Sequence, residues 1–344
     1  MSQKDQNSSK AAASSSSKSS SSNLPSVSLI VTTLNEAGTI NLLLTAIAKQ
    51  THQPDETIIV DGGSQDRTTA KIKKIIKTHQ DLNIKLKQKQ GLNISQGRNL
   101  AIRQAKHDLI AITDAGCIPH KDWLENLLEK YQETKAPVIA GYYQGQPNTA
   151  FEQAVVPFVL VMPDQLDYTR FLPASRSMLL TKQIWKQLGG FREDLQVSED
   201  FAFANKLKRY HIKTAFARDA VVAWLPRSDI SEFFTMIFRF ARGDIRANII
   251  RPRVLLVFLR YWIGLAALIW TWPNLLAALS LILIVFSIYS LWAINKNKKY
   301  VPEGWHWLPV LQITADLAVI LGSLTGLISL VKKGLINLLS RKKI

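Results

Sequence analysis

Short β-branched apolar runs alternate with amphipathic stretches over the first third of the chain. The runs have the length and composition of buried strands, and the stretches between them repeat apolar residues at the spacing of one helix face. The expected strands are 27–32, 57–60, 84–86 and 109–113, and the expected helices are 39–50, 68–79 and 95–105. This alternation predicts an α/β fold with a doubly wound, mostly parallel sheet, in which ligands lie at the carboxyl ends of the strands.

The pattern is weaker after the fourth strand. Further helices are expected at 120–133, 181–188 and 200–210, and further strands at 138–143 and 177–180. The helix 181–188 stops at Gly189 and Gly190, as helices often do. Between 144 and 169 neither period is clear, and we interpret this stretch as an acceptor-facing insertion.

Three long apolar segments follow, at 254–272, 274–294 and 308–331. One continuous helix through the first two would be about 60 Å long, roughly twice the thickness of a bilayer core. We therefore expect a helical hairpin that turns near 271–274, with Arg260 close enough to one end to snorkel. The third segment is either another crossing or a re-entrant or interfacial helix, and its Asp316 must face protein or water.

The distribution of charge indicates how the segments are oriented. The chain of 344 residues has a formal net charge of +17, and Lys and Arg cluster beside the apolar segments. Positive loops favour the cytosol, which places both ends of the hairpin there but would place the basic tail outside if the third segment crossed. Anionic lipid fits this charge better than nucleic acid, because no zinc-finger or RNA-binding motif is present. We expect a multi-pass protein of the cell membrane with its α/β domain in the cytosol.

Composition divides the chain into three parts. Residues 1–26 are rich in Ser and poor in apolar residues, so we expect a disordered tail there, without the apolar core of a secretory signal. The single cysteine, Cys117, permits no intramolecular disulfide. The expected domains are 1–26 as the tail, 27–250 as the α/β domain and 251–344 as the membrane region.

Acidic residues end the second and fourth predicted strands. Asp61 opens an Asp-Gly-Gly-Ser-Gln-Asp motif, where a strand-end carboxylate can accept hydrogen bonds from a base or ribose and glycine lets the backbone approach closely. The same motif also fits a turn followed by a helix cap at Ser64 or Asp66. Asp114 is expected to converge with Asp61 on one crevice and to offer a carboxylate to Mg²⁺ or Mn²⁺.

Together these motifs resemble the family 2 glycosyltransferases, whose nucleotide-sugar domain has the GT-A fold. The resemblance covers residues 27–243 and implies a set of residues that bind the nucleotide sugar: Thr33, Asn35, Glu36, Asp61, Gly63, Ser64, Asp66, Arg98 and Asp114. Asp114 to Gly116 stands at the family's Asp-X-Asp metal motif, with Gly116 in place of a common second acid. One carboxylate, two diphosphate oxygens and water would then have to complete the cation's octahedral shell.

The segment Ser198-Glu199-Asp200 resembles the family's Glu-Asp motif near the acceptor. The resemblance implies that one of the two carboxylates, Asp200 in the first place, is the general base that takes the proton of an acceptor hydroxyl. Both acids also suit the first turn of a helix. Arg239 and Arg242 are candidates for binding the leaving diphosphate, or else lie on a basic helix at the lipid headgroups.

These observations predict an inverting glycosyltransferase at the cytosolic face of the membrane. It would move a sugar from a nucleotide-diphosphate sugar to a lipid, lipid-linked or polysaccharide acceptor. The alternative is a weak or inactive sugar-nucleotide-binding membrane scaffold, which the absent acid at Gly116 favours. A Rossmann dehydrogenase is disfavoured, because the first strand-to-helix turn lacks the Gly-X-Gly-X-X-Gly that a dinucleotide pyrophosphate needs.

Overall fold

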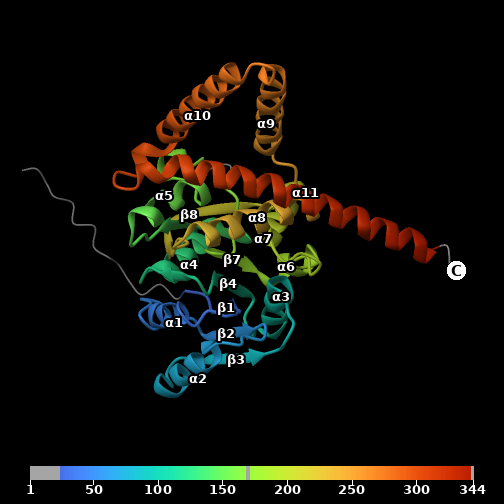
Figure 1. Cartoon of the computed structure of the whole chain (residues 1–344). Helices are drawn as coiled ribbons and strands as arrows, with labels where there is room; N and C mark the ends of the chain where they lie inside the picture. Colours follow the sequence, from blue (N-terminus) through green and yellow to red (C-terminus); the bar gives the residue numbers. More distant parts are fainter. Residues whose placement is uncertain (1–23, 168–170, 342–344) are drawn as a thin grey trace, which may run out of the picture.

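The computed structural model describes residues 24–167 and 171–341, so the tail predicted for 1–26 lies almost entirely outside the described residues. The described part is built on an eight-stranded sheet in the order β3-β2-β1-β4-β7-β6-β8-β5 (Figure 1). The strands are β1 (Val27–Thr33), β2 (Glu56–Asp61), β3 (Ile84–Gln88), β4 (Leu109–Asp114), β5 (Cys117–Pro119), β6 (Val138–Gly145), β7 (Met178–Thr181) and β8 (Thr214–Trp224). Four neighbouring pairs are parallel and three are antiparallel, which confirms a mostly parallel sheet.

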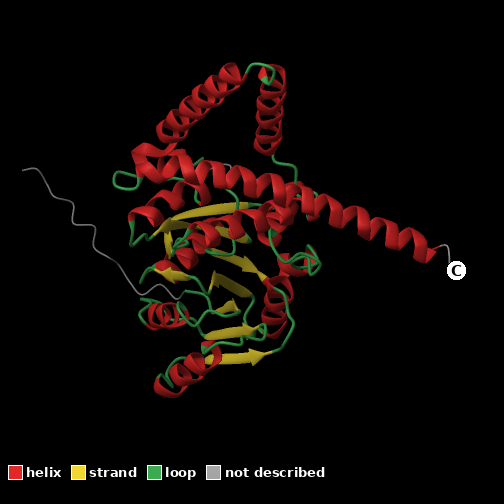
Figure 2. Ribbon diagram, viewed as in Figure 1, coloured by secondary structure: helices red, strands yellow, loops and turns green. Residues whose placement is uncertain are grey.

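Helices cover both faces of the sheet (Figure 2). Alternate residues of β1 belong to different hydrophobic clusters, since Leu29 and Val31 pack on one side and Ile30 on the other. The first cluster includes buried residues of α1 (Ile40–Ala48), α2 (Thr68–Thr78), α4 (Trp123–Thr134) and α5 (Ala150–Val159). The second includes residues of α3 (Ile94–Gln104), α6 (Lys182–Gln187) and α7 (Glu199–Arg209). The doubly wound arrangement predicted from the alternation is confirmed.

The second half of the sheet was only partly predicted. β7 runs antiparallel to β4 and β6, and neither β5 nor β8 was expected as a strand. The pattern of β8 is interrupted because residues 218–220 bulge out of the ladder: Gly141 pairs with Ala217, but Tyr142 pairs with Val221. The bulge places charged residues in mid-strand, which hides the strand's period of two from sequence inspection.

The stretch 144–169 contains α5 and a 3-10 turn, Pro163–Gln165, and it packs against the start of the third apolar segment. Phe151 and Trp307 make an edge-to-face contact with ring centroids 5.2 Å apart. Gln153 Oε1 accepts hydrogen bonds from the backbone N–H groups of Glu303 and Gly304. The described part of this stretch therefore joins the two domains, and its contact with an acceptor stays a prediction.

The expected hairpin is present. Its legs are α9 (Pro252–Thr271) and α10 (Leu275–Asn297), and the Asn274 side chain caps α10 by accepting from the Ala277 N–H at 3.1 Å. Two 3-10 turns, Lys298–Tyr300 and Trp305–Trp307, lead to α11 (Leu308–Arg341). In the described part of the chain, three helical segments are long and apolar enough to cross a membrane. Figure 1 shows α9 and α10 rising from one side of α11, while the sheet lies on the other side.

Helix α11 is attached to the catalytic domain through α8 (Ile230–Arg246), a helix that sequence inspection did not delimit. Glycines allow the close approach: a Cβ at Gly322 would lie 2.4 Å from Phe238 O, and a Cβ at Gly326 would lie 2.9 Å from Ile245 Cβ. Asp316 is buried and its Oδ1 lies 2.5 Å from Arg260 Nη2. Asp316 therefore faces protein as expected, whereas Arg260 pairs with Asp316 instead of snorkelling.

Candidate active site

The carboxyl ends of three parallel strands bring the two predicted acids to one edge of the sheet. β1 lies between β2 and β4, with Thr33 opposite Asp61 and Thr32 opposite Asp114. Adjacent strands are about 4.8 Å apart, so the two aspartates are roughly 10 Å apart across this edge. A crevice at the ends of these strands is where an α/β sheet binds its ligand.

The motif that begins at Asp61 forms a tight turn. The Asp61 carboxylate accepts hydrogen bonds from the backbone N–H groups of Gly63 and Ser64, at 3.1 and 3.0 Å, and from Ser64 Oγ. Gly63 has a φ of +108°, which a residue with a side chain rarely adopts. The turn is confirmed, but the cap predicted at Ser64 or Asp66 is wrong, because α2 has Arg67 at its N-cap, which makes no side-chain capping hydrogen bond. Because Asp61 is 1% exposed, nucleotide binding by its carboxylate stays a prediction.

The loops after β1 and β2 are tied together by the other predicted nucleotide-binding residues. The Asn35 N–H donates to Ser64 Oγ at 2.8 Å, and the Ala37 N–H donates to Asp66 Oδ2 at 3.0 Å. Asn35 has a φ of 57°, a conformation that Asn tolerates better than most residues. The Glu36 carboxylate is half-buried, and burial raises its pKa although the Thr39 hydroxyl donates a hydrogen bond to it. These polar side chains fix the shape of the loops that rim the crevice.

Arg98 links the end of β4 to the start of α7. Its side chain is 1% exposed, with Nη2 2.7 Å from Asp114 Oδ1 and Nη1 in contact with Glu199 Oε1. Burial would lower the pKa of Arg98, but Asp114, Glu199 and Asp200 raise it, so the guanidinium stays charged. Thus β4, α3 and α7 meet at one buried cation, and Asp114 and Glu199 lie on either side of it. Nucleotide contact by Arg98 stays a prediction.

Glu199 and Asp200 begin α7, as the helix-start alternative predicted. Ser198 before them has a φ of 62°, which turns the chain sharply into the helix. Glu199 is 5% exposed, and its burial and the neighbouring Asp200 raise its pKa against the opposing effect of Arg98. Asp200 is half-buried and its Oδ1 accepts from the Phe201 N–H at 2.7 Å. The buried Glu199 is thus a partner of Arg98, while Asp200 is the more accessible carboxylate.

The two arginines predicted on the diphosphate side lie on α8. Arg239 is exposed, whereas Arg242 is partly buried and its Nε has no hydrogen-bond partner in the described part of the chain. α8 also contacts the segment before the Glu-Asp motif, since a Cβ at Gly243 would lie 3.0 Å from Ser198 Oγ. Diphosphate binding by either arginine stays a prediction.

Sequence inspection missed Arg176. Its guanidinium carbon lies 5.6 Å from the Tyr143 ring centroid and 5.7 Å from the Trp224 ring centroid. Its backbone oxygen accepts from Thr113 Oγ1 at 2.8 Å, next to Asp114 at the end of β4. A single arginine between two serines has no local signature, because the position depends on the antiparallel β7, whose start meets the end of β4.

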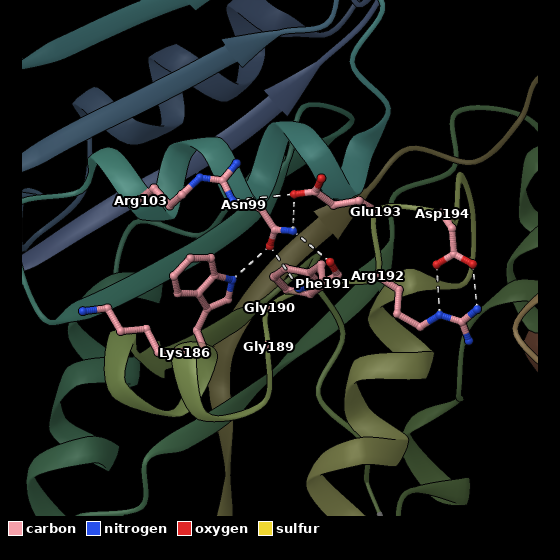
Figure 3. Close-up of a pocket in the computed structure, with 10 residues that line it drawn as sticks. Asn99, Arg103, Lys186, Gly189, Gly190, Phe191, Arg192, Glu193 and Asp194 are labelled. Carbon is pink, nitrogen blue, oxygen red and sulfur yellow. Dashed lines mark hydrogen bonds and ion pairs between the residues drawn. The ribbon is translucent and has the colours of Figure 1, made fainter.

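A separate pocket lies between α3 and the turn after α6 (Figure 3). Asn99 fixes this turn: its Nδ2 donates to Phe191 O at 2.8 Å, and its Oδ1 accepts from Trp185 Nε1 and the Phe191 N–H. Gly190 has a φ of 71°, and a Cβ there would lie 2.8 Å from Asn99 Oδ1. None of the predicted acids lines this pocket, so Asn99 supports the chain that leads toward α7.

Comparison with known proteins agrees with this geometry. The model of the glycosyl transferase family 2 matches residues 28–187, which include β1 to β7 and the Asp61 and Asp114 strand ends. Residues 28–187 therefore form a domain of glycosyl transferase family 2. Glycosyltransferase AglE of Haloferax volcanii is 26% identical over 230 residues, covering 65% of this chain and 75% of that protein.

Two further similarities extend the comparison. A Methanococcus voltae enzyme named dolichyl N-acetyl-alpha-D-glucosaminyl phosphate 3-beta-D-2,3-diacetamido-2,3-dideoxy-beta-D-glucuronosyltransferase is 34% identical over 123 residues, which are 33% of this chain and 37% of that protein. The mannosyltransferase PcManGT of Pyrobaculum calidifontis, solved with GDP-Man and Mn²⁺, has a TM-score of 0.58 and 20% identity, covering 86% of this chain and 87% of that one. The likeness to PcManGT confirms the GT-A fold.

The residues of the transferase do not form a built metal site. Asp114 is the acid at the strand end, Gly116 follows where a second carboxylate would stand, and Asp114 already pairs with Arg98. Within the described residues, no three His, Cys, Asp or Glu side chains are grouped to hold a metal ion. Burial raises the pKa of the Cys117 thiol, which favours its neutral form. One paired carboxylate is a poor donor set for a resident cation.

Proposed function

We propose that this transferase moves a sugar, with inversion, from a nucleotide-diphosphate sugar to a lipid-linked or polysaccharide acceptor at the cytosolic membrane face. The observation that carries the proposal is the Arg98 bridge, which sets Asp114 and Glu199 on either side of one buried guanidinium. It brings the strand ends that suit a donor next to the helix start that suits an acceptor. In this proposal, Thr33, Asn35, Glu36 and the Asp61 turn form the nucleotide side.

The proposed reaction is a single displacement. Asp200 takes the proton of the acceptor hydroxyl as its oxygen bonds to the anomeric carbon, while the bond from that carbon to the phosphate oxygen breaks and the nucleoside diphosphate leaves. Asp200 suits this task because it is half-buried at the start of α7, whereas Glu199 beside it is occupied by Arg98. Arg98 holds the two sides at a fixed separation. Arg242 is a candidate for the diphosphate because its Nε lacks a partner among the described residues.

A lipid-linked acceptor is favoured by the attachment of the domain to the membrane. α8 contacts both the segment before Asp200 and α11, so the acceptor side of the crevice is the side nearest the apolar helices. The Methanococcus voltae relative is named for a dolichyl phosphate acceptor, which supports the same class. A divalent cation at Asp114 stays a prediction, and any such cation would have to be completed largely by the donor's diphosphate and water.

Substitution of Asp200 tests the catalytic proposal. We expect Asp200→Asn to lower transfer roughly 10²- to 10⁴-fold, the usual contribution of a general base, with nucleotide binding retained. Membranes containing the full chain would be incubated with a panel of nucleotide sugars, and extracted lipids analysed by mass spectrometry. Asp219→Asn, an exposed acid in the β8 bulge, is the matched control. Full activity of Asp200→Asn would reject the mechanism.

The inactive-scaffold alternative gives a different result in the same assay. A scaffold would bind nucleotide sugars but transfer none of them, and neither Mn²⁺ nor any acceptor would restore turnover. Transfer of a single sugar by the wild-type chain excludes this alternative.

We further propose that the hairpin crosses the membrane twice and that α11 lies in the interface. α11 cannot cross lipid while it packs on α8, because α8 carries charged residues that would enter the hydrocarbon with it: Arg239, Arg242, Asp244 and Arg246. The exposed large apolar residues of α11 also lie on one face of the helix: Val310, Leu317, Leu321, Leu324, Leu327, Ile328 and Val331. A single apolar stripe is typical of a helix that lies in the plane of the interface.

Cysteine labelling from one side of the membrane tests this topology. Cys117 is buried, so an added cysteine is read without a background signal. With two crossings, Glu303→Cys and Lys332→Cys react from the cytosolic side and Pro273→Cys reacts from the opposite side. Reaction of Lys332→Cys on the same side as Pro273→Cys would instead establish a third crossing.

A further inference from the structure

Arg176 lies beside the carboxyl end of β4, the edge of the sheet that holds Asp114. The Ser177 N–H donates to Ala174 O at 3.0 Å and closes a tight turn that presents Arg176 beside the end of β4. The flanking Ser175 and Ser177 are 1% and 0% exposed, and Ser177 Oγ accepts from Trp123 Nε1 at 2.8 Å. The backbone on either side of Arg176 is therefore fixed before any ligand arrives.

The Arg176 guanidinium is a cation without a carboxylate partner among the described residues. It lies within cation–π distance of the buried rings of Tyr143 and Trp224, whose faces attract its charge. Burial acts to lower the pKa of Arg176, but surrounding acidic groups, Asp114 and Asp200 among them, raise it, so the charge persists. By contrast, Arg98 is paired with two carboxylates, those of Asp114 and Glu199.

We propose that Arg176 binds a phosphate oxygen of the donor's diphosphate and is the fixed cation that neutralises the leaving group. The inference rests on the proposed function, which places a diphosphate at the Asp114 strand end. The backbone of Arg176 is held at that strand end, because its carbonyl oxygen accepts a hydrogen bond from Thr113 Oγ1. The planar guanidinium can donate to two phosphate oxygens at once. Arg176 supplies positive charge at a place with few metal ligands. Gly116 offers no carboxylate, and the carboxylate of Asp114 is already paired with Arg98.

If Arg176 binds the diphosphate, the affinity of the protein for a nucleoside diphosphate depends more on Arg176 than on added metal. Full-length chain in detergent would be titrated with UDP and with GDP in EDTA, and again with Mn²⁺. We expect the wild type to bind one of the two in EDTA and Arg176→Gln to bind it roughly 10- to 100-fold more weakly, as for loss of a hydrogen bond to a charged group. Arg176→Lys, which keeps the charge but loses the fork, is expected between them.

Two controls separate this role from a structural one. Arg218→Gln changes an exposed arginine in the β8 bulge and is expected to bind as the wild type does. The free nucleosides, which lack phosphate, are expected to bind wild type and Arg176→Gln equally, a result that a misfolded variant would not give.

Three results overturn the inference. Binding of UDP or GDP by Arg176→Gln at wild-type affinity removes Arg176 from the phosphate site. If the wild type binds UDP or GDP only when Mn²⁺ is present, a metal ion rather than Arg176 neutralises the diphosphate. A loss of free-nucleoside binding by Arg176→Gln that equals its loss of UDP or GDP binding assigns Arg176 a structural role. A wild-type chain that binds neither nucleotide under any condition contradicts the proposed function itself.

Discussion

The nucleotide domain and the membrane hairpin use apolar residues in opposite ways. In the domain, strands such as β1 and β4 are buried on both faces, and charged groups that enter the interior are paired, as Arg98 is with Asp114 and Glu199. In the hairpin most of the large apolar side chains are exposed, and α9 has no buried residue. The difference teaches that composition identifies an apolar segment, but only its neighbours determine whether protein or lipid covers it.

The two regions meet where α8 packs on α11. Close helix packing and a buried ion pair both contribute to this junction. Glycine allows helices to approach closely, while the buried pair of Asp316 and Arg260 binds α11 to the hairpin. Disruption of each kind of contact should therefore affect the two regions to different extents.

The largest expected effect is that of removing the buried cation of the domain. Arg98→Met leaves Asp114 and the buried Glu199 without their partner, which costs about 3–5 kcal/mol of unfolding free energy and abolishes transfer. Unfolding of the full chain in denaturant, followed by circular dichroism, measures the loss. Arg103→Met is the control on the same helix, because its pair with Glu193 is long, at 3.6 Å, and exposed. Equal stability of the two variants would contradict the role of the bridge.

A smaller effect is expected at the junction of the two regions. Gly322→Leu forces a side chain against the α8 backbone at Phe238, and such overpacking costs about 1–3 kcal/mol. We expect lower transfer activity together with lower thermal stability, since α8 also contacts the segment before Asp200. Gly264→Leu on α9 is the control, because a Cβ there has no described atom within 4 Å. If the α9 variant is as impaired as the α11 variant, α8 does not couple the regions.

The smallest effect is a dependence of domain stability on pH. Glu56 is fully buried, and although burial alone raises the pKa of its carboxyl, hydrogen bonds from the Lys106 N–H, Lys85 and Ser28 lower it below the ordinary 4.5. The unfolded chain then binds the proton first as the pH falls. Stability from this group is complete above about pH 4.5 and is lost as the pH drops through the folded pKa.

Substitution of Glu56 isolates that contribution. Glu56→Gln is expected to reduce unfolding free energy by about 1–3 kcal/mol at neutral pH and to flatten the decline on acidification. Thermal unfolding between pH 3 and pH 7 measures both changes. An unchanged slope in the variant would assign the acid sensitivity to other carboxyls.

The first half of the fold was predictable because its signals are local. β1, β2 and β4 begin within a residue of the expected positions, and the acids at their ends follow from the same pattern. β8 was not found, since its bulge breaks the alternation. The candidate site was also only partly predictable. The Asp61 turn has a local sequence motif, whereas the position of Arg176 depends on the pairing of β7 with β4, which are distant in the sequence.

The sequence by itself determined the α/β domain, its acidic strand ends and the presence of an apolar hairpin, because periodicity and strand-end residues act over a few positions. Only the tertiary structure decided that Arg98 is an internal bridge, that Arg176 lies beside the end of β4 without a described carboxylate partner, and that α11 packs on α8. The physical reason is that ion pairing and burial depend on which segments meet, and these meetings join residues about 100 positions apart, as Arg98 and Glu199 are.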